Sequence, residues 1–154
     1  MSITLRPLTR QNFAAAARLK VAPDQESFVA PNLYSIAECY VEPTWTPLAI
    51  YAGDEMVGFA TIGRDDETGR WWIIRFMIGA AHQNRGYGAA ALPALIDFMR
   101  QRHACTAIYL GYEPDNAVAE RLYARAGFKP TGEIDDGEIV ARLDLSVAAD
   151  AKER

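Results

Sequence analysis

The stretch Gln83-Asn84-Arg85-Gly86-Tyr87-Gly88 has the composition of an anion-binding turn. It follows the apolar run Trp71–Ile78, which is typical of a buried strand, and it leads into residues with the spacing of one helix face: Leu92, Leu95, Ile96 and Met99. The first N–H groups of a helix lack carbonyl partners and carry partial positive charge. Gly86 and Gly88 let the backbone approach a phosphate, and Arg85 adds a charged donor. The pattern predicts a phosphate site, although a plain connecting turn can carry the same two glycines.

A second strand and helix follow. The run Ala107–Tyr112 is typical of a strand, and the residues after it again keep helical spacing: Ala119, Leu122, Tyr123 and Ala126. Asn116 stands where an N-cap residue is favoured, and Gly127 stands where a glycine ends a helix, with Pro130 soon after. The sequence therefore predicts two strand–helix units in succession.

Two motifs in this order resemble the GNAT acetyltransferase superfamily, whose members bind acetyl-CoA. They are Gln-x-x-Gly-x-Gly at 83–88 and Asn-x-x-Ala-x-x-Leu-Tyr-x-x-x-Gly-Phe at 116–128. The resemblance implies an α+β GNAT fold, with a mixed sheet of about seven strands, about four flanking helices and two central strands that separate at the acetyl-CoA site. It also implies one acetyltransferase domain over residues 1–146, with residues 147–154 as a frayed tail. No metal is implied.

The resemblance assigns roles to individual residues. The pyrophosphate loop corresponds to Gln83, Asn84, Arg85, Gly86, Tyr87, Gly88 and Ala89. The strand end at Phe76, Met77 and Ile78 would bind the pantetheine arm and polarise the acetyl carbonyl through its backbone. Asn116 would contact pantetheine, or only cap its helix. Tyr123 would protonate the departing thiolate, although its spacing also suits a core aromatic.

The residue that deprotonates the amine is open. Glu113 follows the strand that should separate from its neighbour, Glu38 lies on a short predicted helix, and Glu26 lies in a turn-rich segment. Ser35-Ile-Ala-Glu38 also has the pattern of a capping box, in which Glu38 would bond a backbone N–H. No base is needed if desolvation lowers the pKa of the amine.

Other polar and aromatic residues have ordinary explanations. Arg75 is predicted to share a strand face with Ile73 and Met77, where an ion pair is expected and a substrate or CoA contact is the alternative. We expect His82 and His103 on the surface. The tryptophans are expected in the core: Trp45, Trp71 and Trp72.

The remaining elements follow from turn signals and periodicity. We predict a strand over 3–7, a helix carrying Phe13 and Ala16, and a short helix with one face formed by Leu33, Ile36, Ala37 and Tyr40. Hairpins are predicted at 48–63, around Gly53-Asp54, and at 129–145, around Asp136-Gly137. Pro93 would remove a hydrogen bond to Ala89 unless its helix begins later.

Composition limits the function classes. The 154 residues are half apolar, carry a net charge of −4, and contain no apolar run of the ~20 residues that a membrane span needs. We therefore expect neither a nucleic-acid partner nor a membrane partner. Cys39 and Cys105 fit core thiols of a cytoplasmic protein, and a homodimer, common among similar proteins, is left open.

Segments outside the coenzyme motifs resemble bacterial GNAT proteins of the spermine/spermidine acetyltransferase type. They include 28–32, 45–51 and 111–116. The resemblance implies acetyl transfer to a small-molecule amine, a polyamine such as spermidine or spermine, which would suit carboxylates at Glu26, Glu38, Glu42 and 65–67. Another small amine, a protein N-terminus, or a domain that binds acetyl-CoA without catalysis are the alternatives. An unrelated nucleotide-binding enzyme is disfavoured, since neither the P-loop nor the dinucleotide glycine pattern is present.

Overall fold

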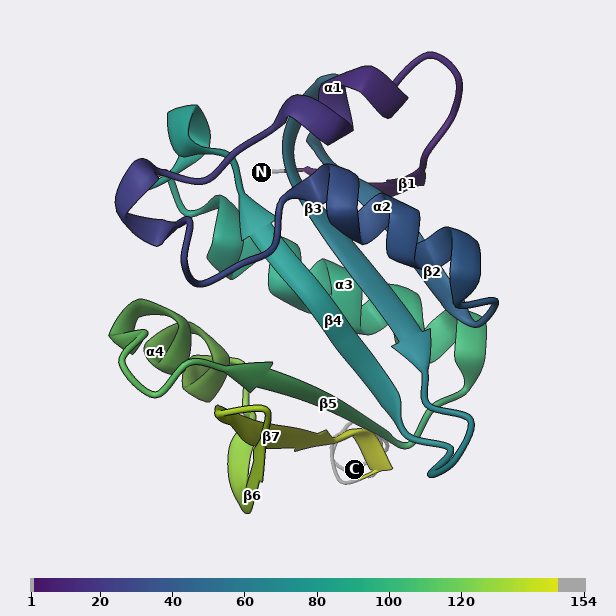
Figure 1. The fold of residues 1–154 in the computed structure, drawn as a ribbon, viewed down its shortest axis with the longest axis vertical. Coiled ribbons are helices and arrows are strands. Elements are labelled where there is room, and N and C mark those ends of the chain that lie inside the picture. Colours follow the sequence, from purple (N-terminus) through teal and green to yellow (C-terminus); the bar gives the residue numbers. More distant parts are fainter. Residues whose placement is uncertain (1, 147–154) are drawn as a thin grey trace.

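One mixed sheet organises the protein. The computed structural model describes residues 2–146, in which seven strands lie in the order β1-β2-β3-β4-β5-β7-β6 (Figure 1). The strands are β1 (Ile3–Pro7), β2 (Trp45–Ala52), β3 (Glu55–Arg64), β4 (Trp71–Ile78), β5 (Ala107–Tyr112), β6 (Lys129–Asp135) and β7 (Glu138–Asp144). The helices are α1 (Phe13–Arg18), α2 (Asn32–Val41), α3 (Tyr87–His103) and α4 (Ala117–Arg125), with short 3-10 turns η1 (Pro23–Gln25) and η2 (Ala80–His82). This confirms the predicted α+β fold; residues 147–154, predicted to fray, lie outside the described range.

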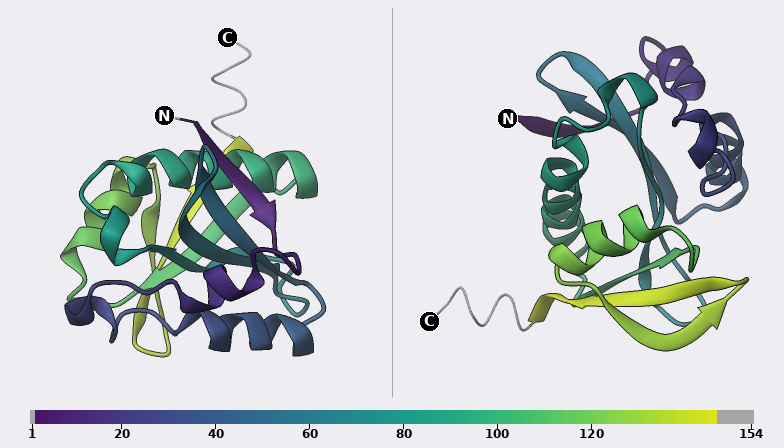
Figure 2. Two further views of the ribbon diagram at one scale, coloured as in Figure 1. Left: turned by 90° about the horizontal axis from the view of Figure 1, so that it is seen from above. Right: turned by 90° about the vertical axis from the view of Figure 1, so that its left-hand side faces the viewer.

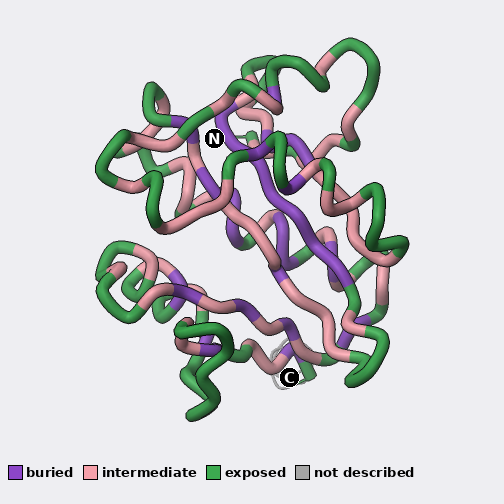
Figure 3. The backbone as a smooth tube through the Cα atoms, viewed as in Figure 1, coloured by how far each residue is buried: buried purple, intermediate pink, exposed green. Residues whose placement is uncertain are grey.

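Helices cover both faces of the sheet (Figure 2). The larger core joins α3 and α4 to the sheet and contains Leu92, Met99 and Tyr123. The smaller core, under α1 and α2, centres on Ala16, Phe59 and Met77. Figure 3 shows β3 buried along most of its length, whereas β6 is exposed. The central strands are therefore held from two sides, which makes their ends a rigid support for a site.

The strands β4 and β5 separate soon after they meet. Their parallel pairing is limited to Trp71 with Ile108 and Trp72 with Tyr109. Beyond these pairs the two strands diverge, as Figure 1 shows. The backbone groups of β4 that face β5 therefore have no partner strand to bond, and unpaired N–H and C=O groups are free to bind a ligand. This confirms the predicted separation of the two central strands.

A β-bulge reverses the faces of β4 at its middle. Thr61 of β3 pairs with Arg75, but the next residue, Ile62, pairs with Ile73, so Ile74 is an extra residue on β4. Ile73 packs in the larger core, whereas Met77 packs in the smaller one. The prediction that Arg75 shares a face with both was therefore wrong for Ile73. The bulge turns Arg75 toward α2, away from α3.

The short helix α2 buries a different face from the predicted one. Its buried residues are Asn32 and Ser35, while Leu33 and Tyr40 are exposed. The Asn32 amide donates hydrogen bonds to the carbonyls of Ala16 and Leu19 at 2.9 and 3.0 Å, which fastens α2 to α1. The buried Asn32 amide, with its hydrogen bonds satisfied, therefore decides which face of α2 is buried, and the apolar periodicity does not.

The ends of the later elements are as predicted. The Asn116 side chain accepts a hydrogen bond from Ala119 N at 3.2 Å, and Gly127 (φ 103°) ends α4 with a bond from Phe128 N to Tyr123 O. Asp136 and Gly137 both have positive φ, as a two-residue hairpin turn requires.

Pro93 and Pro47 lie inside regular elements. The helix α3 begins at Tyr87, so Pro93 is internal, but it and Ala89 are exposed, and water can satisfy the freed carbonyl. The strand β2 begins at Trp45, earlier than predicted, and includes Pro47. Because the pairing of β1 with β2 ends at Leu48, Pro47 has β3 as its one neighbouring strand. The N–H group that proline lacks is therefore not needed for a bond to β1.

Candidate active site

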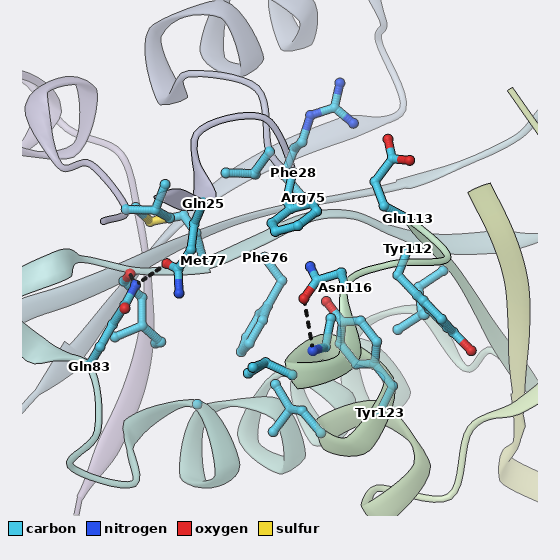
Figure 4. A pocket seen from close by; sticks show the side chains of 18 of the residues that line it. Gln25, Phe28, Arg75, Phe76, Met77, Gln83, Tyr112, Glu113, Asn116 and Tyr123 are labelled. Atoms are coloured by element: carbon cyan, nitrogen blue, oxygen red, sulfur yellow. Dashed lines mark hydrogen bonds between the residues drawn. The ribbon is translucent and has the colours of Figure 1, made fainter. Parts of the chain in front are cut away.

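A wide cleft opens where β4 and β5 separate. It has a volume of about 1150 Å³ and crosses several elements. Its walls are the second half of β4, the loop before α3, the end of β5, the start of α4, the segment 21–31 and the β6–β7 turn. Figure 4 shows Phe76, Asn116 and Tyr123 on one side of this opening, with Arg75 and Glu113 directed to the other. The cleft therefore connects the two faces of the sheet.

The loop before α3 presents free backbone donors to the cleft. Gly86 is the N-cap of α3 with φ 82°, and no side chain caps the helix. A 17-residue helix with an uncapped N-terminus is a favourable place for a phosphate group. A Cβ on Gly86 would have no atom within 4 Å, so the backbone angle and the open space in front of it, rather than packing, favour glycine there.

Most of the predicted loop residues line the cleft, but two do not. Gln83, Asn84, Tyr87 and both glycines belong to the lining. Arg85 and Ala89 are exposed outside it. The Gln83 amide donates to Gln25 Oε1 at 2.7 Å and to the Ile78 carbonyl at 2.9 Å, so it ties η1 to the end of β4. The structure thus gives Gln83 a bracing role beside the predicted coenzyme site.

The end of β4, which the sequence predicts to bind the pantetheine arm, lines the cleft. Phe76, Met77 and Ile78 all belong to the wall, yet their side chains pack into the two cores. What this segment offers a ligand is its backbone on the side facing β5, where strand pairing is missing. Such fixed donors can stabilise negative charge on a carbonyl oxygen.

Tyr123 combines both predicted environments. Its ring packs against Tyr112 and Phe128, with centroids 5.9 and 6.1 Å apart, and the residue is 9% exposed. It also lines the cleft, and its hydroxyl makes no hydrogen bond with residues 2–146. Burial, and to a smaller extent the charge of Glu138, raises the pKa of Tyr123 well above its ordinary value. The phenol is therefore protonated throughout the neutral range and able to donate.

Of the three candidate bases, Glu26 lines the cleft from the segment before α2, and the other two have different surroundings. Glu113 lines the cleft beyond the end of β5. Glu38 does not, because its carboxylate accepts a hydrogen bond from Arg75 Nη2 at 3.2 Å, with both side chains about a quarter exposed. The expected ion pair of Arg75 is thereby confirmed. The capping-box interpretation was wrong, since α2 begins at Asn32 and Ser35 is inside it, donating to the Pro31 carbonyl.

A carboxylate that sequence reasoning missed lies between these elements. Glu138, the first residue of β7, lines the main cleft and also a smaller adjoining one of about 510 Å³. The smaller cleft contains Trp45 and Trp72, which are half-buried there and not in the core as expected, whereas Trp71 packs against the larger core. Only the position of Glu138 directly after the Asp136-Gly137 turn could have drawn attention to it.

The histidines and cysteines differ in how well they follow expectation. His82 is partly buried against Tyr87 and lines the cleft, and His103 stacks on Trp71 with centroids 4.1 Å apart, so neither is a free surface residue. The two cysteines follow the expectation of core thiols: Cys105 is buried and Cys39 is half-buried. Burial, together with the charge of Glu38, raises the pKa of Cys39 to about 11. Both thiols are therefore poor nucleophiles.

Two wider features of residues 2–146 bear on the class of protein. No group of three or more histidine, cysteine or acidic side chains there is arranged to hold a metal ion. No helix in the same range is long and apolar enough to cross a membrane.

Comparison with known proteins agrees with this geometry. Residues 13–128 match the acetyltransferase (GNAT) family. The chain is 35% identical to a spermine/spermidine N(1)-acetyltransferase of Bacillus subtilis (strain 168), over 94% of this chain and all of that protein. Among solved structures, the aminoglycoside acetyltransferase AAC(6')-Ib in complex with coenzyme A aligns with a TM-score of 0.81 at 19% identity, covering 98% of this chain and 99% of that one.

A second solved structure is the spermidine N-acetyltransferase from Vibrio cholerae in complex with CoA and spermine. It aligns with a TM-score of 0.74 at 18% identity, covering 94% of this chain and 96% of that one. At these identities the two structures establish the fold, whereas the family match and the full-length relative establish membership. The chain belongs to the GNAT family and is an acetyl-CoA-dependent N-acetyltransferase.

Proposed function

We propose that the protein transfers the acetyl group of acetyl-CoA to a primary amine of a polyamine such as spermidine or spermine. The observation that carries the proposal is the 35% identity to a spermine/spermidine N(1)-acetyltransferase over that protein's whole length. The aligned region spans 94% of this chain, so it includes both the coenzyme side and the acceptor side of the cleft.

The charge of the cleft supports a cationic acceptor. Six carboxylates line the main cleft: Asp24, Glu26, Glu113, Asp115, Asp136 and Glu138. The cations in the same lining are fewer, namely Arg75, Arg121 and Arg125, and Arg75 is already paired with Glu38. The smaller cleft adds Glu42 and the acidic turn 65–67. An excess of negative charge concentrates cations near the site and disfavours anionic acceptors.

On the coenzyme side, the proposal assigns the diphosphate to the free N–H groups at the start of α3. The pantetheine arm would lie between β4 and β5, bonded by the unpaired backbone of Phe76–Ile78, with Asn116 beside it at the start of α4. Asn116 also caps α4 through its side-chain oxygen, so its amide nitrogen remains free to donate to a ligand. The acetyl carbonyl would then meet backbone donors of β4.

On the acceptor side, the amine would approach from the α2 face of the sheet. It attacks the thioester carbonyl, and the C–N bond forms as the carbonyl oxygen takes negative charge. The C–S bond then breaks, and the thiolate takes the proton of the Tyr123 hydroxyl. The positively charged nitrogen of the new amide loses its proton to solvent, and the phenolate regains one from solvent. The net change is one amide and one free CoA thiol from one amine and one thioester.

The substrate class is tested by a panel of acceptors. Purified protein is incubated with acetyl-CoA and, separately, with spermidine, spermine, amino acids, an aminoglycoside and a short peptide, and release of CoA thiol is followed. We expect kcat/KM to be greatest for the polyamines. If the aminoglycoside or the peptide is acetylated and polyamines are not, the enzyme remains an N-acetyltransferase but the polyamine assignment fails.

A further inference from the structure

Glu138 occupies a position that sets it apart from the other acidic residues of the cleft. Among the acidic residues it alone lines both the main cleft and the smaller one. The other residues common to the two linings include Arg75, Gly111 and the bulged segment of β4. A Cβ built on Gly111 would lie 3.1 Å from Glu138 Oε1 and 3.4 Å from its Cβ. The Glu138 side chain therefore lies directly over β5, on the stretch that β4 has just left.

The face of the sheet that Glu138 covers is the one from which the amine is proposed to approach. On β5, Ile108, Leu110 and Tyr112 pack into the core under α3 and α4, so Gly111 faces the opposite way, toward the α2 side. Arg75 lies on that side too, held by Glu38. The Glu138 carboxylate, over Gly111, is thus next to the gap between β4 and β5. It lies on the opposite side of the sheet from Tyr123.

The charges around Glu138 come from several elements. Glu113 lies after β5, Arg75 on β4, Asp135 at the end of β6, and Asp136 in the turn before β7. Burial and the charge of Glu113 raise the pKa of Glu138, against the opposing effect of Arg75. The side chain makes no hydrogen bond or ion pair within residues 2–146. A half-buried carboxylate without a partner, in a negative field, has a strong affinity for a cation or a proton.

We propose that Glu138 is the carboxylate that receives the acceptor ammonium group and removes its proton before attack. Glu113 is the weaker candidate, since it lines only the main cleft, beyond the end of β5 and further from the point where the strands separate. The inference rests on the proposed direction of amine approach, and it does not depend on which amine is the substrate.

The proton transfer balances without another reactant. The ammonium group gives one proton to a Glu138 oxygen, which leaves a neutral amine whose lone pair can attack the thioester. The protonated carboxyl then releases that proton to solvent through the open cleft. A base with a raised pKa is better matched to this task at neutral pH than an ordinary carboxylate.

The test is Glu138→Gln, assayed with whichever amine of the acceptor panel the wild-type enzyme acetylates fastest. This choice separates the two proposals, because the polyamine assignment can fail while the Glu138 assignment is still measured. Glu120→Gln is the matched control, since it removes one exposed carboxylate of α4 that lies outside the lining of the cleft. Circular dichroism and a thermal melt check that each variant is folded.

We expect Glu138→Gln to lower kcat at neutral pH by about 10²-fold or more, with the affinity for acetyl-CoA unchanged. The loss should shrink as pH rises toward the pKa of the amine, because solvent then removes the proton. Glu138→Asp should retain part of the activity. The proposal is overturned if Glu138→Gln keeps the wild-type kcat, if only the KM of the amine rises, or if Glu113→Gln causes the loss in its place.

Discussion

Replacing Tyr123 with phenylalanine separates its chemistry from its packing. Phenylalanine keeps the ring between Tyr112 and Phe128 and removes only a hydroxyl that makes no hydrogen bond within the described chain. We therefore expect the free energy of unfolding to change by less than about 1 kcal/mol. Loss of a general acid lowers turnover by about 10²–10⁴-fold, which corresponds to roughly 3–5 kcal/mol of activation free energy.

The assay compares kcat, the dissociation constant of acetyl-CoA and urea unfolding for Tyr123→Phe and a control. Tyr109→Phe is the control, because Tyr109 is a partly buried tyrosine that lies outside the lining of both clefts. We expect only Tyr123→Phe to lose turnover, with acetyl-CoA affinity unchanged in both. A Tyr123→Phe enzyme with wild-type turnover would refute the role as proton donor and leave a core aromatic.

The raised pKa of Tyr123 adds a dependence of stability on pH. In the unfolded chain the phenol ionises near its ordinary pKa of about 10, whereas in the folded protein burial delays ionisation to higher pH. The unfolded state therefore loses its proton first, and the free energy of unfolding falls as pH rises above about 10. The free energy of unfolding of the Tyr123→Phe protein should fall less steeply with pH in that range. An identical slope for the two proteins would mean that the phenol is not buried in solution.

Three other perturbations address the loop, the ion pair and the charge of the cleft. Gly86→Glu should weaken acetyl-CoA binding by more than tenfold, because it places a negative charge beside the diphosphate. Gly53→Glu is the control, since Gly53 also has a positive φ and open space around it, and it should keep the wild-type affinity. If calorimetry gives the two variants equal affinities for acetyl-CoA, the loop assignment is contradicted. Glu38→Gln should lower the free energy of unfolding, measured by urea titration, by about 1–2 kcal/mol, because Arg75 loses its partner carboxylate. It should also lower the pKa of Cys39, and the rate of alkylation with iodoacetamide measures this change. An unchanged alkylation rate would contradict the effect of Glu38 on Cys39. The KM for spermidine should rise between about 0.05 and 0.5 M NaCl as screening lengths shorten, and a KM independent of salt would argue against an acidic acceptor site.

The parts of the fold set by local chemistry could be predicted from the sequence. Asn116 and Gly127 bound α4 because an N-cap needs a side-chain acceptor and a helix end needs a residue at positive φ. The strands at 3–7 and 71–78 were predicted with their observed ends, since apolar runs were bounded by turns. The turn that precedes α3 was located by its glycines, although Gly88 lies in the first turn of the helix.

What could not be predicted depends on contacts between distant segments. The extra residue at Ile74 is invisible in an apolar run, yet it decides the face of Arg75. The orientation of α2 follows from the bonds of Asn32 to α1, and that amide gives no periodic signal. Glu138 reaches the site only because β7 pairs with β5 and brings its first residue over Gly111. Acidic residues in turns are common, so nothing local distinguished this one.

The central claim is tested most directly by the products of one reaction. The protein is incubated with acetyl-CoA and spermidine, and the amine is examined by mass spectrometry while free CoA thiol is measured in the same sample. The account predicts one acetyl group on a primary amine of spermidine for each thiol released, and neither product without protein. Thiol release without acetylated spermidine, or no reaction while acetyl-CoA is bound, would contradict it.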